Sequence, residues 1–210
     1  QVGASALLAA LKRNLRAEIA SWLGQHCISV FNDFNRFFDS LDIPTLLVEA
    51  IKTEFPSSVL SILLQQRLAL RTIHANGYIS ELIQVFKSIV AGCKSSVALT
   101  RAYTKRAIKE ICRKYPEANT ALFVDDTRMQ SVDNEFNATL DAIVPAVALF
   151  GDLVETLKLK LSDKAAVTAS PPKLAIAFSQ EMKQCYNMTF NVEDQPRDVG
   201  VSHSAAVAPP

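Results

Sequence analysis

The sequence has no hydrophobic run of the length that crosses a membrane. A membrane-spanning helix needs about 18–20 consecutive apolar residues, and no stretch of this chain reaches that length. The Ala/Leu-rich start is followed by Lys12, Arg13 and Arg16, which reverses the charge order of a secretory signal peptide. We therefore expect a protein without a membrane anchor that is intracellular, nuclear or cytoplasmic, and not secreted.

Cysteine is scarce and widely spaced. The four cysteines are Cys27, Cys93, Cys112 and Cys185, and none forms a Cys-x-x-Cys pair. This spacing favours neither a zinc site nor a disulfide framework, and it suits a reducing compartment.

Net charge is also nearly absent. The 22 Lys and Arg residues almost balance the 21 Asp and Glu residues, which leaves +1. A nucleic-acid-binding domain usually carries a basic footprint, so support for such a function has to come from a local cluster. Hydrophobic residues make up 49% of the 210 residues, which is enough to bury one full-sized core.

Hydrophobic periodicity predicts interleaved helices and strands. Helices are expected at 4–23, 45–55, 59–64, 97–115 and 133–150, and strands at 27–31, 68–75, 78–86, 120–124, 127–132, 157–161 and 173–178. Asn76-Gly77 favours a two-residue hairpin turn. We expect the α+β class, with an antiparallel sheet and helices packed on one face.

Two adjacent carboxylates, Asp125 and Asp126, follow the apolar stretch Leu122-Phe123-Val124 where a strand should turn. Adjacent aspartates repel each other, whereas Mg²⁺ prefers carboxylate oxygens as ligands. The pair therefore predicts a metal site, and a solvated β-turn is the alternative.

A third carboxylate, Asp33, ends the predicted strand at 27–31, and Phe38, Asp39 and Asp42 follow it. Strand ends in one sheet can bring such carboxylates together. For Asp33 the alternative is a helix cap or a turn, and Asp42 is expected to cap the next helix.

A glycine loop leads into a basic helix. Gly92 permits close approach of the backbone to a ligand, and Lys94 and Ser96 offer polar contacts. In the helix, Arg101, Lys105 and Lys109 share a face at i, i+4 spacing, which suits a phosphate backbone. A plain glycine loop and a solvated helix face are the alternatives.

These stretches resemble three motifs of reverse transcriptases, especially those of non-LTR retroelements and group II introns. The run from Asp33 to Asp42 resembles motif A, residues 91–96 resemble motif B, and Phe123-Val124-Asp125-Asp126 resembles the aromatic-x-Asp-Asp hairpin of motif C. Residues 157–168 loosely resemble motif D. The three motifs occur in the family's order over residues 28–168.

The resemblance implies a polymerase palm-like fold and RNA-directed DNA synthesis with two Mg²⁺ or Mn²⁺ ions. It makes Asp33, Asp125 and Asp126 catalytic metal ligands and Phe38 the gate against the sugar's 2′ position. A core phenylalanine is the alternative for Phe38. The implied partners are an RNA template, a DNA primer, deoxynucleoside triphosphates and the remaining parts of a retrotransposon polyprotein. The expected division is a fingers or connection remnant at 1–24, a palm domain at 25–180 and a disordered tail at 181–210.

The chain departs from the family pattern in specific places. The motif B glutamine is Ala91 and the proline is Val97, and fingers and thumb regions are expected to be incomplete. A catalytically inactive remnant that binds nucleic acid or acts as a scaffold is therefore the second hypothesis. An unrelated α+β interaction domain is the third, and an RNA-directed RNA polymerase is a neighbouring alternative.

Overall fold

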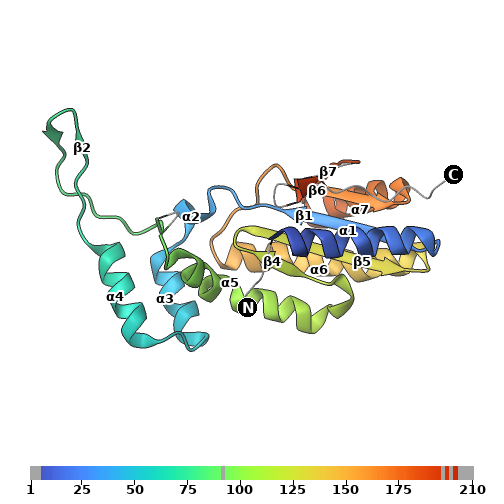
Figure 1. Ribbon diagram of the computed structural model, residues 1–210, viewed down its shortest axis with the longest axis horizontal. Coiled ribbons are helices and arrows are strands. Elements are labelled where there is room, and N and C mark those ends of the chain that lie inside the picture. Colours follow the sequence, from blue (N-terminus) through green and yellow to red (C-terminus); the bar gives the residue numbers. More distant parts are fainter. Residues whose placement is uncertain (1–5, 91–92, 195–196, 199–200, 203–210) are drawn as a thin grey trace.

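The computed structural model describes residues 6–90, 93–194, 197–198 and 201–202, and a five-stranded sheet forms its centre (Figure 1). The strand order is β4-β5-β1-β6-β7. These strands are β1 (His26–Asn32), β4 (Ala121–Phe123), β5 (Asp126–Asp133), β6 (Ala166–Ser170) and β7 (Asn191–Val192). β7 runs parallel to β6, whereas the other neighbours are antiparallel. The α+β class is confirmed, but the sheet is mixed and not purely antiparallel as expected.

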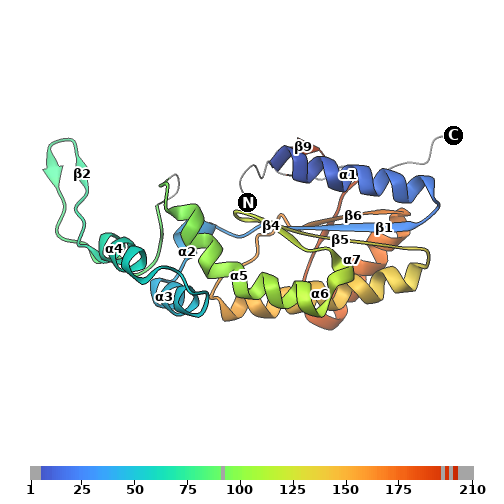
Figure 2. The ribbon, with the colours of Figure 1, turned by 60° about the horizontal axis from the view of Figure 1, so that its bottom comes forward.

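Helices cover both faces of this sheet. Figure 2 shows α5 (Ser96–Lys114), α6 (Phe136–Thr156) and α7 (Pro172–Tyr186) on one face and α1 (Ala6–Trp22) on the other. The expectation that all helices pack on one face is therefore wrong for α1. The side chains of β1 explain this, because they are buried on both faces.

Alternate residues of β1 serve two separate cores. Ile28 and Val30 belong to the main core, between the sheet and the three helices. Cys27 packs with Ala17 and Ala20 of α1 in a second, smaller core. A strand buried on both sides reads as a continuous apolar run, as residues 27–31 do.

The chain path of the centre is β1-α5-β4-β5-α6-β6, a β-α-β-β-α-β arrangement. In this arrangement β1 pairs with β5, although the two strands are far apart in sequence. Cross-strand pairs run from His26–Asp133 to Asn32–Thr127. This register positions the candidate site.

An extension separates β1 from α5. Its elements are α2 (Phe37–Ser40), α3 (Ile43–Lys52), α4 (Ser57–Leu68), β2 (His74–Ala75) and β3 (Tyr78–Ile79). In Figure 1, α4 and the β2–β3 hairpin project away from the sheet. The turn at Asn76-Gly77 has φ values of 49° and 82°, so the predicted hairpin is confirmed, with shorter strands than expected.

Two predicted strands are wrong. Residues 157–161 follow α6 as a loop, in which Lys158 has a φ of 56° and Leu161 makes a single bridge to Phe34. Residues 173–178 belong to α7, whose Leu174, Phe178 and Met182 repeat every four residues on its buried face.

The C-terminal part is ordered past the expected boundary at residue 181. α7 continues to Tyr186, Phe190 is buried, and β7 pairs with β6. Short elements complete the described chain: the 3-10 turn η1 (Pro116–Ala118), β8 (Arg197–Asp198) and β9 (Val201–Ser202).

Within the described residues, α6 is the one helix that is long and apolar enough to cross a membrane by length and composition. Half of its apolar window is buried inside the fold, where it packs against β5, α5 and α7. A core helix passes the same test, so α6 is weak evidence for a membrane span.

Candidate active site

The end of β1 and the β4–β5 hairpin bring carboxylates to one edge of the sheet. Asn32, the last residue of β1, pairs with Thr127, and Phe123 pairs with Asp126. Continuing the register by one residue places Asp33 beside Asp126. Facing residues of antiparallel strands have Cα atoms about 4.5–5.5 Å apart, so their carboxylates share one small region.

The hairpin turn lies one residue earlier than the sequence suggested. Phe123 and Asp126 form the last pair, which leaves Val124 and Asp125 as the turn and makes Asp126 the first residue of β5. Val124 has a φ of 59°. A β-branched residue seldom adopts this left-handed conformation, and such strain concentrates at functional sites. The turn holds Asp125 out from the strand pair.

Asp125 and Asp33 act on each other electrostatically. Burial raises the pKa of Asp125 above its ordinary value, and the nearby Asp33 charge raises it further. A hydrogen bond from its own backbone and the Arg128 charge oppose this rise without cancelling it. A cation bound beside Asp125 would favour the ionised form of its carboxyl group.

Asp126 already has a cationic partner. Its Oδ2 atom lies 3.3 Å from Nη2 of Arg128, whose side chain is only 4% exposed. The Arg128 guanidinium also lies over the Phe31 ring, 5.9 Å from its centroid. Arg128 therefore competes with any metal ion for Asp126, and Asp33 and Asp125 are the more available ligands.

The donor set suits a hard divalent cation. Mg²⁺ is commonly held by one or two carboxylates together with substrate phosphates and water, and Asp33 and Asp125 supply two carboxylates. Among the described residues, no group of three or more His, Cys, Asp or Glu side chains is arranged to hold a metal by itself. Metal binding remains a prediction: the two carboxylates would hold an ion weakly, and substrate phosphates would complete its coordination.

Phe38 packs as part of the core in this structure. It is half-buried in α2, contacts the main core, and meets Phe37 edge to face with the ring centroids 5.6 Å apart. Its carbonyl oxygen accepts a hydrogen bond from the Ile89 amide at 2.9 Å. The packing role is observed, and the gate role remains a prediction.

The glycine loop is described only in part. Gly92 and Ala91 lie outside the described residues. Lys94 is exposed, whereas Ser96 is buried and its hydroxyl donates to the Val90 carbonyl oxygen at 2.6 Å. Ser96 thus holds the loop to the start of α5, and its contact with a nucleotide remains a prediction.

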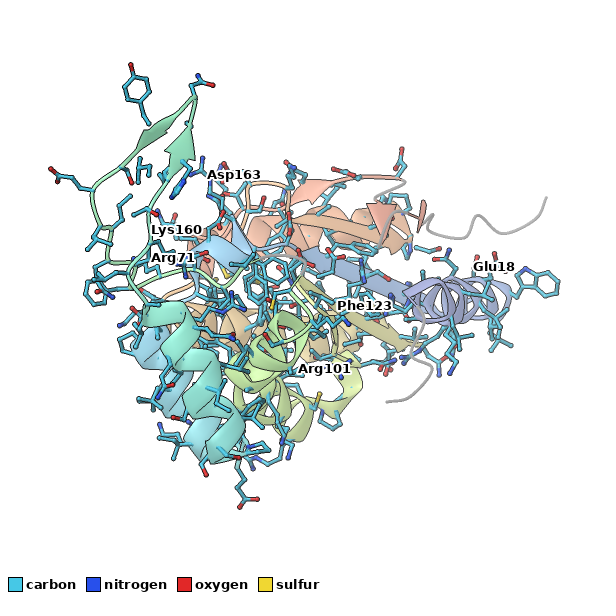
Figure 3. All side chains as sticks on the ribbon, turned by 60° about the vertical axis from the view of Figure 1, so that its left-hand side comes forward. Glu18, Arg71, Arg101, Phe123, Lys160 and Asp163 are labelled. Carbon is cyan, nitrogen blue, oxygen red and sulfur yellow. The ribbon has the colours of Figure 1, made fainter. Side chains whose placement is uncertain are left out.

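The predicted cationic face of α5 is exposed. Arg101, labelled in Figure 3, and Lys105 and Lys109 all face solvent, while the opposite side of the helix is buried. Arg106 differs from them, because its Nη1 atom pairs with Glu49 Oε1 at 2.9 Å. Arg101, Lys105 and Lys109 are the α5 cations best placed to follow a phosphate backbone.

Comparison with protein-family models and with curated proteins found no match. The resemblance to reverse transcriptases therefore rests on the motifs in this sequence and remains a prediction.

Sequence reasoning missed two buried arginines. Arg128 could have been found, because it lies two residues after Asp126 and alternate residues of a strand share a face. Arg67 of α4, which is 5% exposed, contacts the Ser95 hydroxyl. No local pattern marks Arg67, since its contact joins segments 28 residues apart.

Proposed function

We propose that this chain is the palm-like catalytic core of an RNA-directed DNA polymerase from a retrotransposon-like element. The observation that carries the proposal is the register that brings the end of β1, with Asp33, beside the β4–β5 hairpin, with Asp125, 92 residues later in sequence. Two separate chain segments deliver carboxylates to one sheet edge, as two-metal nucleotidyl transfer requires. This juxtaposition counts against the alternative in which Asp125-Asp126 is only a turn.

The chain path supports a palm-like fold. In β1-α5-β4-β5-α6-β6, the motif A-like residues follow the central strand and the motif C-like hairpin lies beside it. Phosphoryl transfer asks the protein chiefly for positioning and charge stabilisation. A hairpin with a strained turn next to a central strand provides fixed positions for carboxylates.

Each residue has a role in this proposal. Asp33 and Asp125 would hold two Mg²⁺ or Mn²⁺ ions, with Asp126 as the peripheral ligand whose charge Arg128 shares. When bound, the ions activate the attacking 3′-oxygen and neutralise charge on the triphosphate. Gly92, Lys94 and Ser96 would contact the nucleotide, and Phe38 would exclude a 2′-hydroxyl.

The substrates proposed are an RNA template, a DNA primer and deoxynucleoside triphosphates. Arg101, Lys105 and Lys109 would follow the backbone of the bound duplex. Other parts of a polyprotein would supply the fingers and thumb, and the site of action would be the nucleus or cytoplasm.

Calorimetry with Mn²⁺ or Mg²⁺ tests the metal site first, because it does not require fingers or a thumb. We expect weak binding by the wild type and its loss in Asp125→Asn. Asp141→Asn is the matched control, because Asp141 is an exposed carboxylate on α6. Identical titrations for the wild type and Asp125→Asn would overturn the metal site. Primer extension on an RNA template should then fall to background in Asp125→Asn and Asp33→Asn but not in Asp141→Asn.

Stability without metal gives an independent measurement. Because the pKa of Asp125 is raised in the folded state, its ionised form costs stability at neutral pH. Asp125→Asn should therefore stabilise the metal-free protein, by less than about 1 kcal/mol because solvent screens a half-exposed charge. The gain should shrink as the pH falls through the raised pKa, where wild-type Asp125 is also neutral.

A catalytically inactive nucleic-acid-binding module is the second candidate. The ion pair between Arg128 and Asp126 favours it, because the pair occupies one of the three carboxylates. Such a module would bind nucleic acid through α5 without metal. Replacing Arg101, Lys105 and Lys109 with alanine should reduce the salt slope of log K by up to roughly 0.9 per cation. Replacing the exposed Lys173 and Lys183 of α7 should leave the slope unchanged.

A further inference from the structure

The loop before α5 holds a cysteine in contact with two polar side chains. Cys93 is partly exposed, and its Sγ atom lies 3.1 Å from Oγ of Ser95. Its carbonyl oxygen accepts a hydrogen bond from the Ser96 amide at 2.9 Å, which fixes Cys93 just before the first turn of a 19-residue helix. The partial positive charge of a helix N-terminus favours a thiolate.

A buried cation faces this thiol. Arg67 enters from α4 with 5% exposure, and its Nη2 atom donates to Oγ of Ser95 at 3.4 Å. Its Nε atom has no hydrogen-bond partner in the described part of the chain, and no described carboxylate forms an ion pair with it. A buried guanidinium needs a negative partner.

Cys93 is the group beside Arg67 that can supply the negative charge. Hydrogen bonds from Ser95, then from Arg67, lower the pKa of Cys93 to about 7, and the Arg67 charge adds to their effect. Lys94 is the next cation along the chain, and Arg71 donates to the Arg67 carbonyl oxygen at 3.1 Å. The surroundings on α4 and at the start of α5 are therefore electropositive.

The other three thiols lie in different environments. Cys27 is buried beneath α1, and burial raises its pKa to about 11. Cys112 and Cys185 are exposed. The Cys112 sulfur lies 3.8 Å from the Thr120 carbonyl oxygen, which is an acceptor and does not stabilise a thiolate.

We infer that Cys93 is the reactive thiol of this chain and a site of mixed-disulfide formation with low-molecular-weight disulfides such as oxidised glutathione. The Cys93 thiolate attacks one sulfur of the disulfide, and a new sulfur–sulfur bond forms. The original bond breaks, and the other half leaves as a thiolate that takes up the proton Cys93 had released. The oxidised disulfide is itself the oxidant, so no further reactant is needed. The inference stands apart from the proposed polymerase function.

The rate of modification by oxidised glutathione tests this inference. The full chain carrying Cys112→Ser and Cys185→Ser leaves Cys93 and the buried Cys27, and intact-mass spectrometry follows the adduct from pH 5.5 to 9. We expect a rate profile with its midpoint near pH 7. At pH 7 the gain in thiolate outweighs the loss in nucleophilicity, so the reaction should be roughly three- to fourfold faster than for a thiol of ordinary pKa, near about 8.5.

Variants of Arg67 and Ser95 test whether these groups set the pH midpoint of the Cys93 reaction. Arg67→Met should move the midpoint to higher pH, and Arg67→Lys should move it less because the charge is kept. Should Arg67→Met fail to fold, Ser95→Ala removes the nearest hydrogen bond and should give the same upward shift. A matched variant that keeps only Cys112 and Cys27 should react more slowly at pH 7.

Two results would overturn the inference. One is a wild-type midpoint in the ordinary thiol range above pH 8. The other is a midpoint that stays fixed in every folded variant of Arg67 and Ser95.

Discussion

The sheet with its three covering helices and the β2–β3 hairpin of the extension use apolar side chains in opposite ways. The helices α5, α6 and α7 bury Tyr103, Phe150 and Phe178 completely or almost completely. In the extension, Tyr78 is 81% exposed and Ile79 is 65% exposed. Burial therefore holds the sheet and its helices together, whereas a turn and hydrogen bonds set the shape of the hairpin. The helices of the extension lie between these extremes, because Leu46 and Ala50 of α3 and Leu60 of α4 are buried in the main core.

Apolar packing of α3 against α5 joins the extension to the covering helices, and polar contacts add to it. Lys158, which follows α6, donates to Oδ2 of Asp42 at 2.9 Å, and Asp42 caps α3 by accepting from the Thr45 amide at 3.0 Å. The part of the extension from α3 onward thus begins at a charged junction. Its stability should respond to this junction more than to its exposed apolar residues.

Deleting one large core side chain should have the largest effect on the free energy of unfolding. Phe150 is 2% exposed, and the centroid of its ring lies 5.9 Å from the centroid of the Phe34 ring. Phe150→Ala should lower the free energy of unfolding by about 3–5 kcal/mol because it removes buried surface and leaves a cavity. Ile79→Ala, the control in the extension, should change it by less than about 0.5 kcal/mol. Equal losses in urea unfolding would abolish the contrast between the regions.

Breaking the junction should have an intermediate effect. Asp42→Ala removes the cap of α3 and should cost about 1–2 kcal/mol, whereas Lys158→Ala, at an exposed position, should cost less than about 1 kcal/mol. Burial would raise the pKa of Asp42, but hydrogen bonds from Thr45 and Lys158 outweigh it and lower the pKa.

This lowered pKa fixes the sign of the pH dependence. The stabilisation from Asp42 is fully present above the ordinary aspartate pKa, near about 4, and is lost as the pH falls through the folded-state value. Urea unfolding of the wild type and Asp42→Ala should therefore converge in acid. A difference that grows as the pH falls would contradict the cap.

Changing the turn of the β2–β3 hairpin should have the smallest effect on the global free energy of unfolding. Gly77 has a φ of 82°, and Gly77→Ala should strain the turn by about 1 kcal/mol although the site is open. Hydrogen exchange of the β2–β3 amides should accelerate while global unfolding changes by less than about 0.5 kcal/mol. Gly77→Asn is the control, because asparagine tolerates this conformation. A loss of global stability would show that the hairpin supports the core.

Local signals predicted much of the fold. The apolar run at 27–31, the periodicity of α5, the Asn76-Gly77 turn and the cap at Asp42 each depend on neighbouring residues, and each is confirmed. They could be inferred because propensity and environment agree at these positions.

Other elements were not predictable because tertiary contacts decide them. Residues 157–161 alternate like a strand, yet the strand that pairs with β1 is the Ala- and Ser-containing β6. In the site, the juxtaposition of Asp33 and Asp125 was expected from strand ends. The burial of Arg128 and the contact between Arg67 and Ser95 depend on packing between distant segments.

The central position of β1 has a consequence for the newly made chain. Its partners in the sheet are β5 and β6, and Phe31 pairs with Ala166, 135 residues later. At the usual 5–20 residues per second, a ribosome needs roughly 7–27 s to produce that stretch. During this interval α1 is the already-synthesised neighbour that packs on β1 in the finished fold. α1 can therefore cover the Cys27 face of β1 before the partner strands are made, whereas the face with Ile28 and Val30 waits for the later helices.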